Sequence, residues 1–113
     1  MKHMQVSKRD ESFIRILSNC ETNIVGYATV GKKSKKLGYM NVLLTDINFE
    51  YLNNTITIQH CWLQESDYPV VASKALNSMP VGTKIKVYFK FYKYRDAIDR
   101  NMHGMKISYL ERV

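Results

Sequence analysis

The chain has 113 residues, of which 45% are hydrophobic, which is enough for one domain with a single core and too few for a second catalytic domain. Its 17 lysine and arginine residues outnumber 10 acidic residues, and the resulting formal net charge of +7 suits a polyanionic partner such as nucleic acid. No apolar run approaches the roughly 20 residues of a membrane-spanning helix, and no apolar signal segment is visible, so we expect a cytoplasmic protein without a membrane partner.

Residues 1–23 are expected to form an N-terminal arm ahead of a barrel domain over 24–113. The arm contains one short apolar group, Phe13, Ile14, Ile16 and Leu17, whose spacing fits a helical turn or a first strand. Cys20 and Cys61 are far apart and have no CxxC neighbour, which favours buried thiols in a reducing compartment over a disulfide.

A first strand is predicted over 24–30, where β-branched residues dominate, and it is followed by a lysine-rich loop over 31–38. This loop has a glycine near each end and no acidic residue. It fits an ordinary solvated hairpin loop, but it also fits a loop that contacts phosphate groups, which is the reading we favour. Its candidate contacts, with the tyrosine that follows, are Lys32, Lys33, Lys35, Lys36 and Tyr39.

Two further strands are predicted over 39–47 and 55–63, joined by a tight turn at Asn53-Asn54. A period of two places Ile56, Ile58, His60 and Trp62 on one face of the later strand. His60 is therefore expected at a polar corner of the core and Trp62 inside it. A short amphipathic helix follows over 70–79, with apolar residues at helical spacing, and Pro80 ends it.

The longest clean alternation in the sequence lies in the next strand, 84–95. Ile85, Val87, Phe89 and Phe91 share one face, which is expected to enter the core. The other face interleaves cations with aromatic rings, as a surface for phosphates and stacked bases would. The alternative is structural, because tyrosine favours strands and lysine protects sheet edges. The candidate binding residues here are Lys84, Lys86, Tyr88, Lys90, Tyr92, Tyr94 and Arg95.

A polar loop over 96–104 and a last strand over 105–112 complete the predicted order of three strands, a helix and two strands. The fold class is therefore mainly β. This order, with the segment Pro80-Val81-Gly82-Thr83-Lys84 before the long alternating strand, resembles the OB-fold of single-strand-binding proteins over roughly residues 24–112. The resemblance implies a five-stranded barrel with one short helix between strands 3 and 4.

The resemblance also implies a ligand path across the second and third strands, flanked by the loops 31–38 and 95–104. The later loop would add Arg100 and His103 to Arg95. The lysine-tyrosine strand departs from this pattern, since it lies beside that path.

Catalysis is not expected. Asp96 and Asp99 fit charge balance near arginines, and neighbouring His60 and Cys61 would point to opposite faces of a strand, so they cannot easily chelate one metal ion. No cofactor or metal is expected. The predicted function is binding of single-stranded nucleic acid, DNA before RNA, with little sequence specificity. The alternative is a protein-interaction module, an inhibitor or accessory subunit of a nucleic-acid-processing machine, with a replication or recombination protein as a candidate partner.

Overall fold

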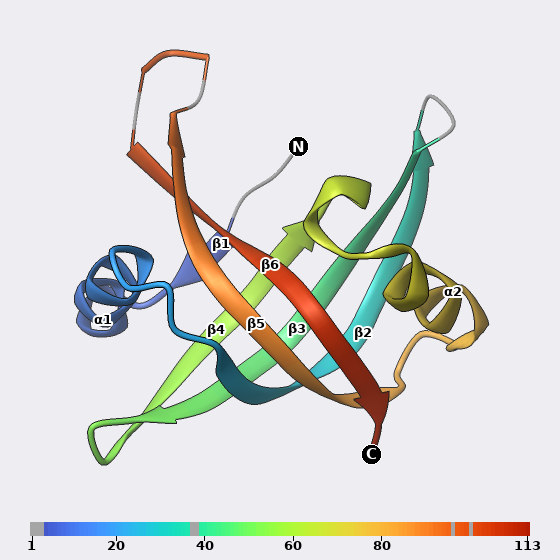
Figure 1. Ribbon diagram of the computed structural model, residues 1–113, viewed down its shortest axis with the longest axis horizontal. Coiled ribbons are helices and arrows are strands. Elements are labelled where there is room, and N and C mark those ends of the chain that lie inside the picture. The colour runs from blue at the N-terminus through green and yellow to red at the C-terminus, as the bar shows by residue number, and fades with distance from the viewer. Residues whose placement is uncertain (1–3, 37–38, 96, 100) are drawn as a thin grey trace.

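The computed structural model describes residues 4–36, 39–95, 97–99 and 101–113. Most of the regular structure within these ranges is antiparallel sheet (Figure 1). In chain order the elements are β1 (Met4–Val6), α1 (Lys8–Ser18), β2 (Ile24–Lys36), β3 (Tyr39–Tyr51), β4 (Asn54–Leu63), a 3₁₀ turn η1 (Glu65–Asp67), α2 (Val70–Ser78), β5 (Lys84–Arg95) and β6 (Asn101–Arg112).

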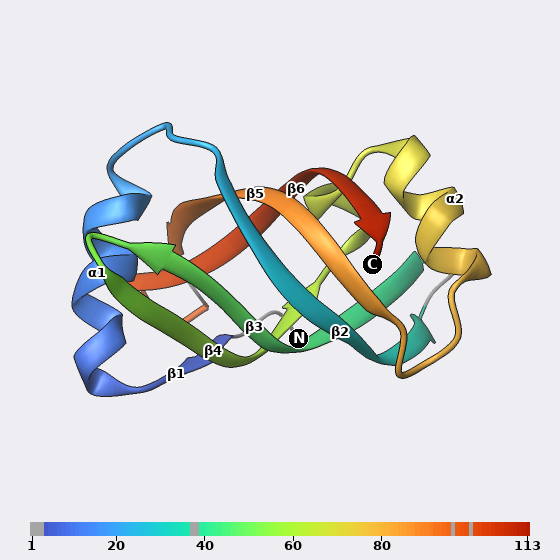
Figure 2. The same cartoon turned by 90° about the horizontal axis from the view of Figure 1, so that it is seen from below.

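The strands form one sheet in the order β1-β4-β3-β2-β5-β6, which curls into a half-barrel with β4 in contact with β6. Strong coiling follows from the right-handed twist of long strands, which brings distant strands of one sheet together. Figures 1 and 2 show α1 and α2 at opposite ends of this curled sheet. The inner face of the sheet and these two helices enclose the core.

The inner face of β5 supplies the centre of the core. Ile85, Val87 and Phe89 are completely buried and Phe91 nearly so, which confirms the alternation predicted for this strand. The ring of Phe89 packs edge-on against Phe49 of β3, with 5.7 Å between the ring centroids. The predicted helix is also confirmed, because α2 turns its buried apolar side toward the sheet.

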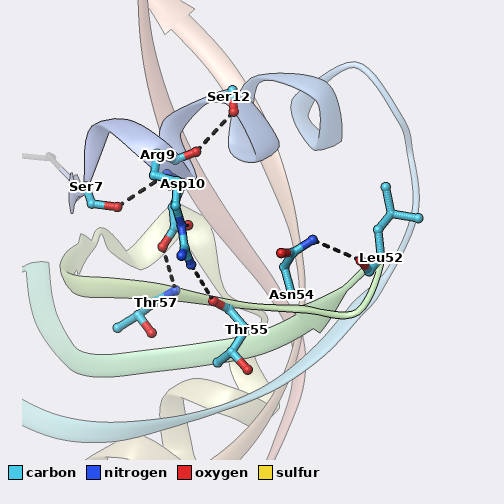
Figure 3. A network of polar contacts seen from close by, with 8 residues as sticks. All are labelled: Ser7, Arg9, Asp10, Ser12, Leu52, Asn54, Thr55 and Thr57. Atoms are coloured by element: carbon cyan, nitrogen blue, oxygen red, sulfur yellow. Dashed lines mark hydrogen bonds and ion pairs between the residues drawn. The ribbon is translucent and has the colours of Figure 1, made fainter.

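The N-terminal segment is tied to the sheet by its own helix (Figure 3). Ser7 caps α1 by accepting a hydrogen bond from the Asp10 backbone N–H at 3.3 Å, and the buried Asp10 carboxylate accepts one from the Thr57 N–H at 3.2 Å. Ile14 and Leu17 of α1 belong to the same core as the strands. Residues 8–18 therefore close one end of the half-barrel.

The expected five-stranded barrel with one helix is wrong in its element count. The described residues hold six strands, because β1 adds to the edge of β4, and α1 joins α2, which lies between β4 and β5. The predicted loop 31–38 is largely strand, because β2 continues through the lysines to Lys36, and the predicted loop 96–104 is partly strand, because β6 begins at Asn101. Lysine is compatible with exposed positions of a strand, so the four lysines did not mark a loop.

The turn between β3 and β4 lies one residue earlier than expected, at Leu52-Asn53. Both residues have positive φ, 49° and 62°, which is the conformation of a type I′ hairpin turn. Leu52 is largely exposed there. The predicted strand boundaries around Asn53-Asn54 shift accordingly.

The buried side chains of β4 change from even-numbered to odd-numbered positions along the strand. The prediction that Trp62 lies inside the core is therefore wrong. Ile56 and Ile58 point inward as expected, but Cys61 follows them into the core while Trp62 is only half-buried. The paired strand β3 changes phase at the same level, where Asp46 has φ 49° and lies just before the buried Ile47. One irregular residue in a strand pair moves the following side chains to the opposite face.

The two cysteines also differ from each other. Cys61 is buried as expected, but Cys20 is exposed, because it follows the end of α1 in the connection to β2. Neither of the α-helices in the described ranges has the length and apolar character needed to cross a bilayer.

Candidate nucleic-acid interface

The outer side of β2, β5 and β6 carries tyrosine and lysine side chains from three adjacent strands. The strand register pairs Val25 with Tyr88 and Tyr88 with Tyr109, and it pairs Tyr27 with Lys86. Side chains paired in this way lie on the same face, about 5 Å apart at their Cβ atoms. We call this surface the tyrosine-lysine face and define it by Tyr27, Lys84, Lys86, Tyr88, Lys90, Lys106 and Tyr109.

The aromatic rings of this face are accessible to a ligand. Tyr27 is 49% exposed and Tyr109 is 51% exposed, although large aromatic side chains are usually well covered in a folded domain. Tyr88 is half-buried and its ring centroid lies 5.5 Å from that of Tyr109, with the planes tilted by 52°. A tilted pair with one exposed partner leaves ring surface open for a further stacked group.

Lysines lie directly beside these rings. The Lys86 ammonium is 5.6 Å from the centroid of the Tyr88 ring. A side-chain hydrogen bond with Tyr88 raises the pKa of Lys86, with smaller contributions in the same direction from Tyr27 and from Glu111. Lys86 therefore keeps its positive charge over the whole physiological range. Glu111, the residue paired with Lys86 on β6, is the acidic member of this neighbourhood.

The lysines of the face are not neutralised by ion pairs. Across the described ranges, every ion pair between side chains uses an arginine, as in Arg9–Asp10, Arg15–Glu11 and Arg95–Asp99. Ammonium groups that form no ion pair within the protein can neutralise phosphates of a bound strand and release its counterions.

Tyr92 does not belong to this open surface, although the sequence predicted it there. Its hydroxyl donates a hydrogen bond to Asp67 Oδ1 at 2.7 Å, and its ring packs on Gly104, where an added Cβ would lie 2.5 Å from the ring. Burial raises the pKa of Tyr92, and the hydrogen bond with Asp67 adds to the effect. Tyr92 thus ties β5 and β6 to the η1 turn.

Replacing Tyr92 by phenylalanine is expected to destabilise the fold by about 1–3 kcal/mol, because the buried Asp67 carboxyl group loses a hydrogen-bond donor. Urea denaturation of the two proteins would measure the difference. Tyr109→Phe is the matched control, since that tyrosine is exposed, and it should unfold like the parent. Equal stability of Tyr92→Phe and the parent would show that the Tyr92–Asp67 contact contributes nothing.

The predicted loop lysines whose side chains the structure describes have different surroundings. Lys33 lies in register with the buried Val42 and donates hydrogen bonds to the backbone carbonyls of Met79 and Asn77 at the end of α2, where a cation also complements the helix dipole. Lys32 and Lys35 are exposed. The side chains of Lys36 and Tyr39 lie outside the described part of the structure.

Lys32 points to the outer side of the sheet, where it is in register with Leu43, and Leu43 is in register with Trp62 of β4. This row lies on β2, β3 and β4, and the resemblance placed the ligand path across β3 and β4, beside the predicted loop 31–38 that holds Lys32. The sequence did not predict that Trp62 would lie there half-buried.

The remaining predicted residues have partners within the protein or lie outside the described residues. Arg95 is paired with Asp99 at 2.9 Å, and Tyr94 stacks obliquely 5.9 Å from Tyr92. Arg100 lies outside the described residues. His103 shares a 2.9 Å hydrogen bond with Ser18 of α1, and burial lowers the pKa of its imidazole.

No family model matches the sequence, and no curated protein matches it either. The surface itself is therefore the basis for inferring function. Sequence reasoning missed Tyr27, Tyr109 and Lys106, although each lies in a segment predicted as strand. Their signal is the side-chain period of two in 24–30 and 105–112, which can be combined with the lysine-tyrosine strand only when the pairing of the strands is known.

Proposed function

We propose that this protein binds single-stranded nucleic acid on the tyrosine-lysine face, with single-stranded DNA as the first candidate and little sequence preference. The observation that carries the proposal is the exposure of Tyr27 and Tyr109 beside Tyr88 and lysines that form no ion pairs. Stacking on aromatic rings accepts any base, and lysine contacts to phosphates are independent of sequence.

The sheet topology supports an OB-like barrel for this proposal. β2 pairs with both β3 and β5, β3 pairs with β4, β5 pairs with β6, and β4 contacts β6, while α2 connects β4 to β5. Once β1 and α1 are set aside, this is a five-stranded curled sheet with a helix between its third and fourth strands. The tyrosine-lysine face uses its first, fourth and fifth strands.

A protein-interaction module is the alternative, and the distribution of apolar side chains favours it less. Val25, which is in register with Tyr88, is exposed next to the tyrosine-lysine face. Apart from Val25 and this face, the exposed large apolar residues of the described chain are spread over several helices, turns and loops, and Val70 and Val71 are neighbours in α2. The full set is Ile16, Leu52, Val70, Val71, Val81, Ile98 and Val113. Apolar side chains scattered in this way are normal on a protein surface, whereas protein interfaces present a contiguous patch.

The test is fluorescence anisotropy with labelled single-stranded DNA, single-stranded RNA and blunt duplex of matched length, repeated over a salt series. We expect the single strands to bind more tightly than the duplex, because duplex bases are already stacked on one another. Equal or tighter binding to the duplex, or no binding below about 100 μM at low salt, where phosphate contacts are strongest, would contradict the proposal.

Changing Lys84 and Lys86 together to glutamine is expected to reduce the slope of log affinity against log salt by up to about 1.4, since each phosphate contact to a single strand contributes about 0.7. The same measurement on Lys32→Gln/Lys35→Gln separately tests the exposed lysines of the β2–β3 hairpin. Lys74→Gln, an exposed lysine on α2, is the control for a change in net charge. Slopes that are the same in all four proteins would exclude phosphate contacts at both places.

A further inference from the structure

A hollow of about 490 Å³ lies at the end of the tyrosine-lysine face, where β5 and β6 meet the segment around η1. Its lining includes Lys90 of β5, Lys106 of β6, Asn23 ahead of β2 and Ser66 of η1. It adjoins Tyr88 and Tyr109, because Lys90 follows Tyr88 on the same face of β5.

The two lysines of this hollow are direct cross-strand partners, Lys90 paired with Lys106. Like charges at paired positions of a sheet repel each other and destabilise the pair. Neither ammonium group forms an ion pair with a carboxylate in the described part of the chain. An anion between the two ammonium groups would relieve this repulsion.

The two carboxylates nearest in sequence to Ser66 are engaged elsewhere. Glu65 accepts a hydrogen bond from the Met40 N–H at 3.3 Å, and Asp67 accepts from the Tyr92 hydroxyl and from the Gln64 N–H, each at 2.7 Å. Both side chains are thus directed to protein donors and not to the lysine pair.

The hollow also offers neutral donors suited to an oxyanion. Ser66 and Asn23 line it, and a serine hydroxyl and an asparagine side-chain amide are both hydrogen-bond donors. Ser108 also lines the hollow, but its hydroxyl already donates to the Tyr88 carbonyl at 3.1 Å. Two ammonium groups and two neutral donors match an acceptor that has several oxygens and negative charge.

We propose that this hollow is a phosphate-binding site, in which Lys90 and Lys106 neutralise the phosphate and Ser66 and Asn23 donate hydrogen bonds to its oxygens. The proposal rests on the proposed function in one respect, that the phosphate belongs to a strand whose neighbouring base stacks on Tyr88. The same chemistry would accept a terminal phosphate monoester, an internal diester or free inorganic phosphate.

The direct test is a titration of the full chain with sodium phosphate, compared with sodium chloride at equal ionic strength. Phosphate is expected to raise the melting temperature above that in chloride and to shift the amide resonances of Asn23, Ser66 and Lys106. Lys106→Gln should lose both effects while melting no lower than the parent without phosphate, because the repulsion with Lys90 is removed. Lys93→Gln, which changes an exposed lysine of β5 outside the hollow, should respond like the parent.

Ser66→Ala provides a second variant that leaves the lysine pair intact, and it should weaken the response to phosphate without changing the fold. Identical responses to phosphate and chloride in the parent would overturn the proposal. A Lys106→Gln protein that binds phosphate as the parent does would also overturn it.

Oligonucleotides separate the sources of the phosphate and separate this proposal from the proposed function. One charge-assisted contact corresponds to about a tenfold change in affinity. If a 5′-phosphate improves affinity by that factor, and only when Lys106 is present, the bound phosphate is a terminal monoester. Equal affinity with and without the 5′-phosphate, reduced by Lys106→Gln, would identify an internal diester. Response to inorganic phosphate without binding of any oligonucleotide would support the site and remove the proposed function.

Discussion

Replacing Phe89 by alanine is expected to reduce the free energy of unfolding by about 3–5 kcal/mol, the largest stability effect that we anticipate for a single change in this chain. Phe89 is completely buried, and its ring contacts those of Phe49 and Phe91, with centroids 5.7 and 5.3 Å away. Truncation would leave a cavity between β3 and β5 that a close-packed sheet cannot fill by small shifts.

The matched control for Phe89→Ala is its neighbour. Tyr88→Ala removes a ring of similar size from the outer face of the same strand, where a cross-strand aromatic contact contributes about 0.2–1 kcal/mol. Urea denaturation followed by tryptophan fluorescence would measure both. If Phe89→Ala fails to fold, Phe89→Leu, which removes less volume, should still show a larger loss than Tyr88→Ala. The reverse order of stabilities would mean that the two faces of β5 are assigned the wrong way round.

The sequence predicted β5 and α2 well because each has a period that only one structure satisfies. Apolar residues that alternate over twelve positions would be spread around all sides of a helix. The apolar residues from Ala72 to Met79 would be divided between the two faces of a strand. The order of the five strands that follow α1 was predicted for the same reason. These are local properties, and each segment carries its own signal.

The ends of the strands could not be predicted in the same way. Lys32 to Lys36 belong to β2 because β3 pairs with them, and nothing in the five residues themselves requires a strand. The change of phase between Ile58 and Cys61 depends on the irregular backbone at Asp46 in the neighbouring strand. The residue pattern of one β-strand contains no information about irregularities in the β-strand that pairs with it.

The tyrosine-lysine face was predicted only in part, and the reason is similar. Tyr88, Lys86 and Lys90 were found because they alternate on one strand, whereas Tyr27 and Tyr109 join them only through pairing across β2, β5 and β6. Tyr92 was misplaced because its hydrogen bond to Asp67 joins residues that are 25 positions apart. Both outcomes show that residue type and period identify a face, while tertiary contacts decide which of its members remain available to a ligand.

Tyr27→Ala and Tyr109→Ala are each expected to weaken binding of a single strand by about 1–3 kcal/mol, or about 5- to 150-fold in the dissociation constant, which is the range for loss of one stacked base. The slope of log affinity against log salt should stay nearly unchanged, because stacking releases no counterions. Tyr27→Phe should retain the affinity of the parent, since a phenyl ring stacks as well as a phenol. The measurement is anisotropy with the same labelled oligonucleotide over a salt series.

Two comparisons sharpen this result. Ile16→Ala removes a comparably exposed apolar side chain from α1 and should leave binding unchanged. The double variant Tyr88→Ala/Tyr109→Ala should lose less than the sum of its single changes, because the two rings are in contact and support the same stacked group. Affinities of Tyr27→Ala and Tyr109→Ala equal to that of the parent, in proteins that melt normally, would mean that the exposed rings make no contact with the strand. Any binding would then be electrostatic, through the lysines of the tyrosine-lysine face, or would use the row of Lys32, Leu43 and Trp62 on the outer side of β2, β3 and β4.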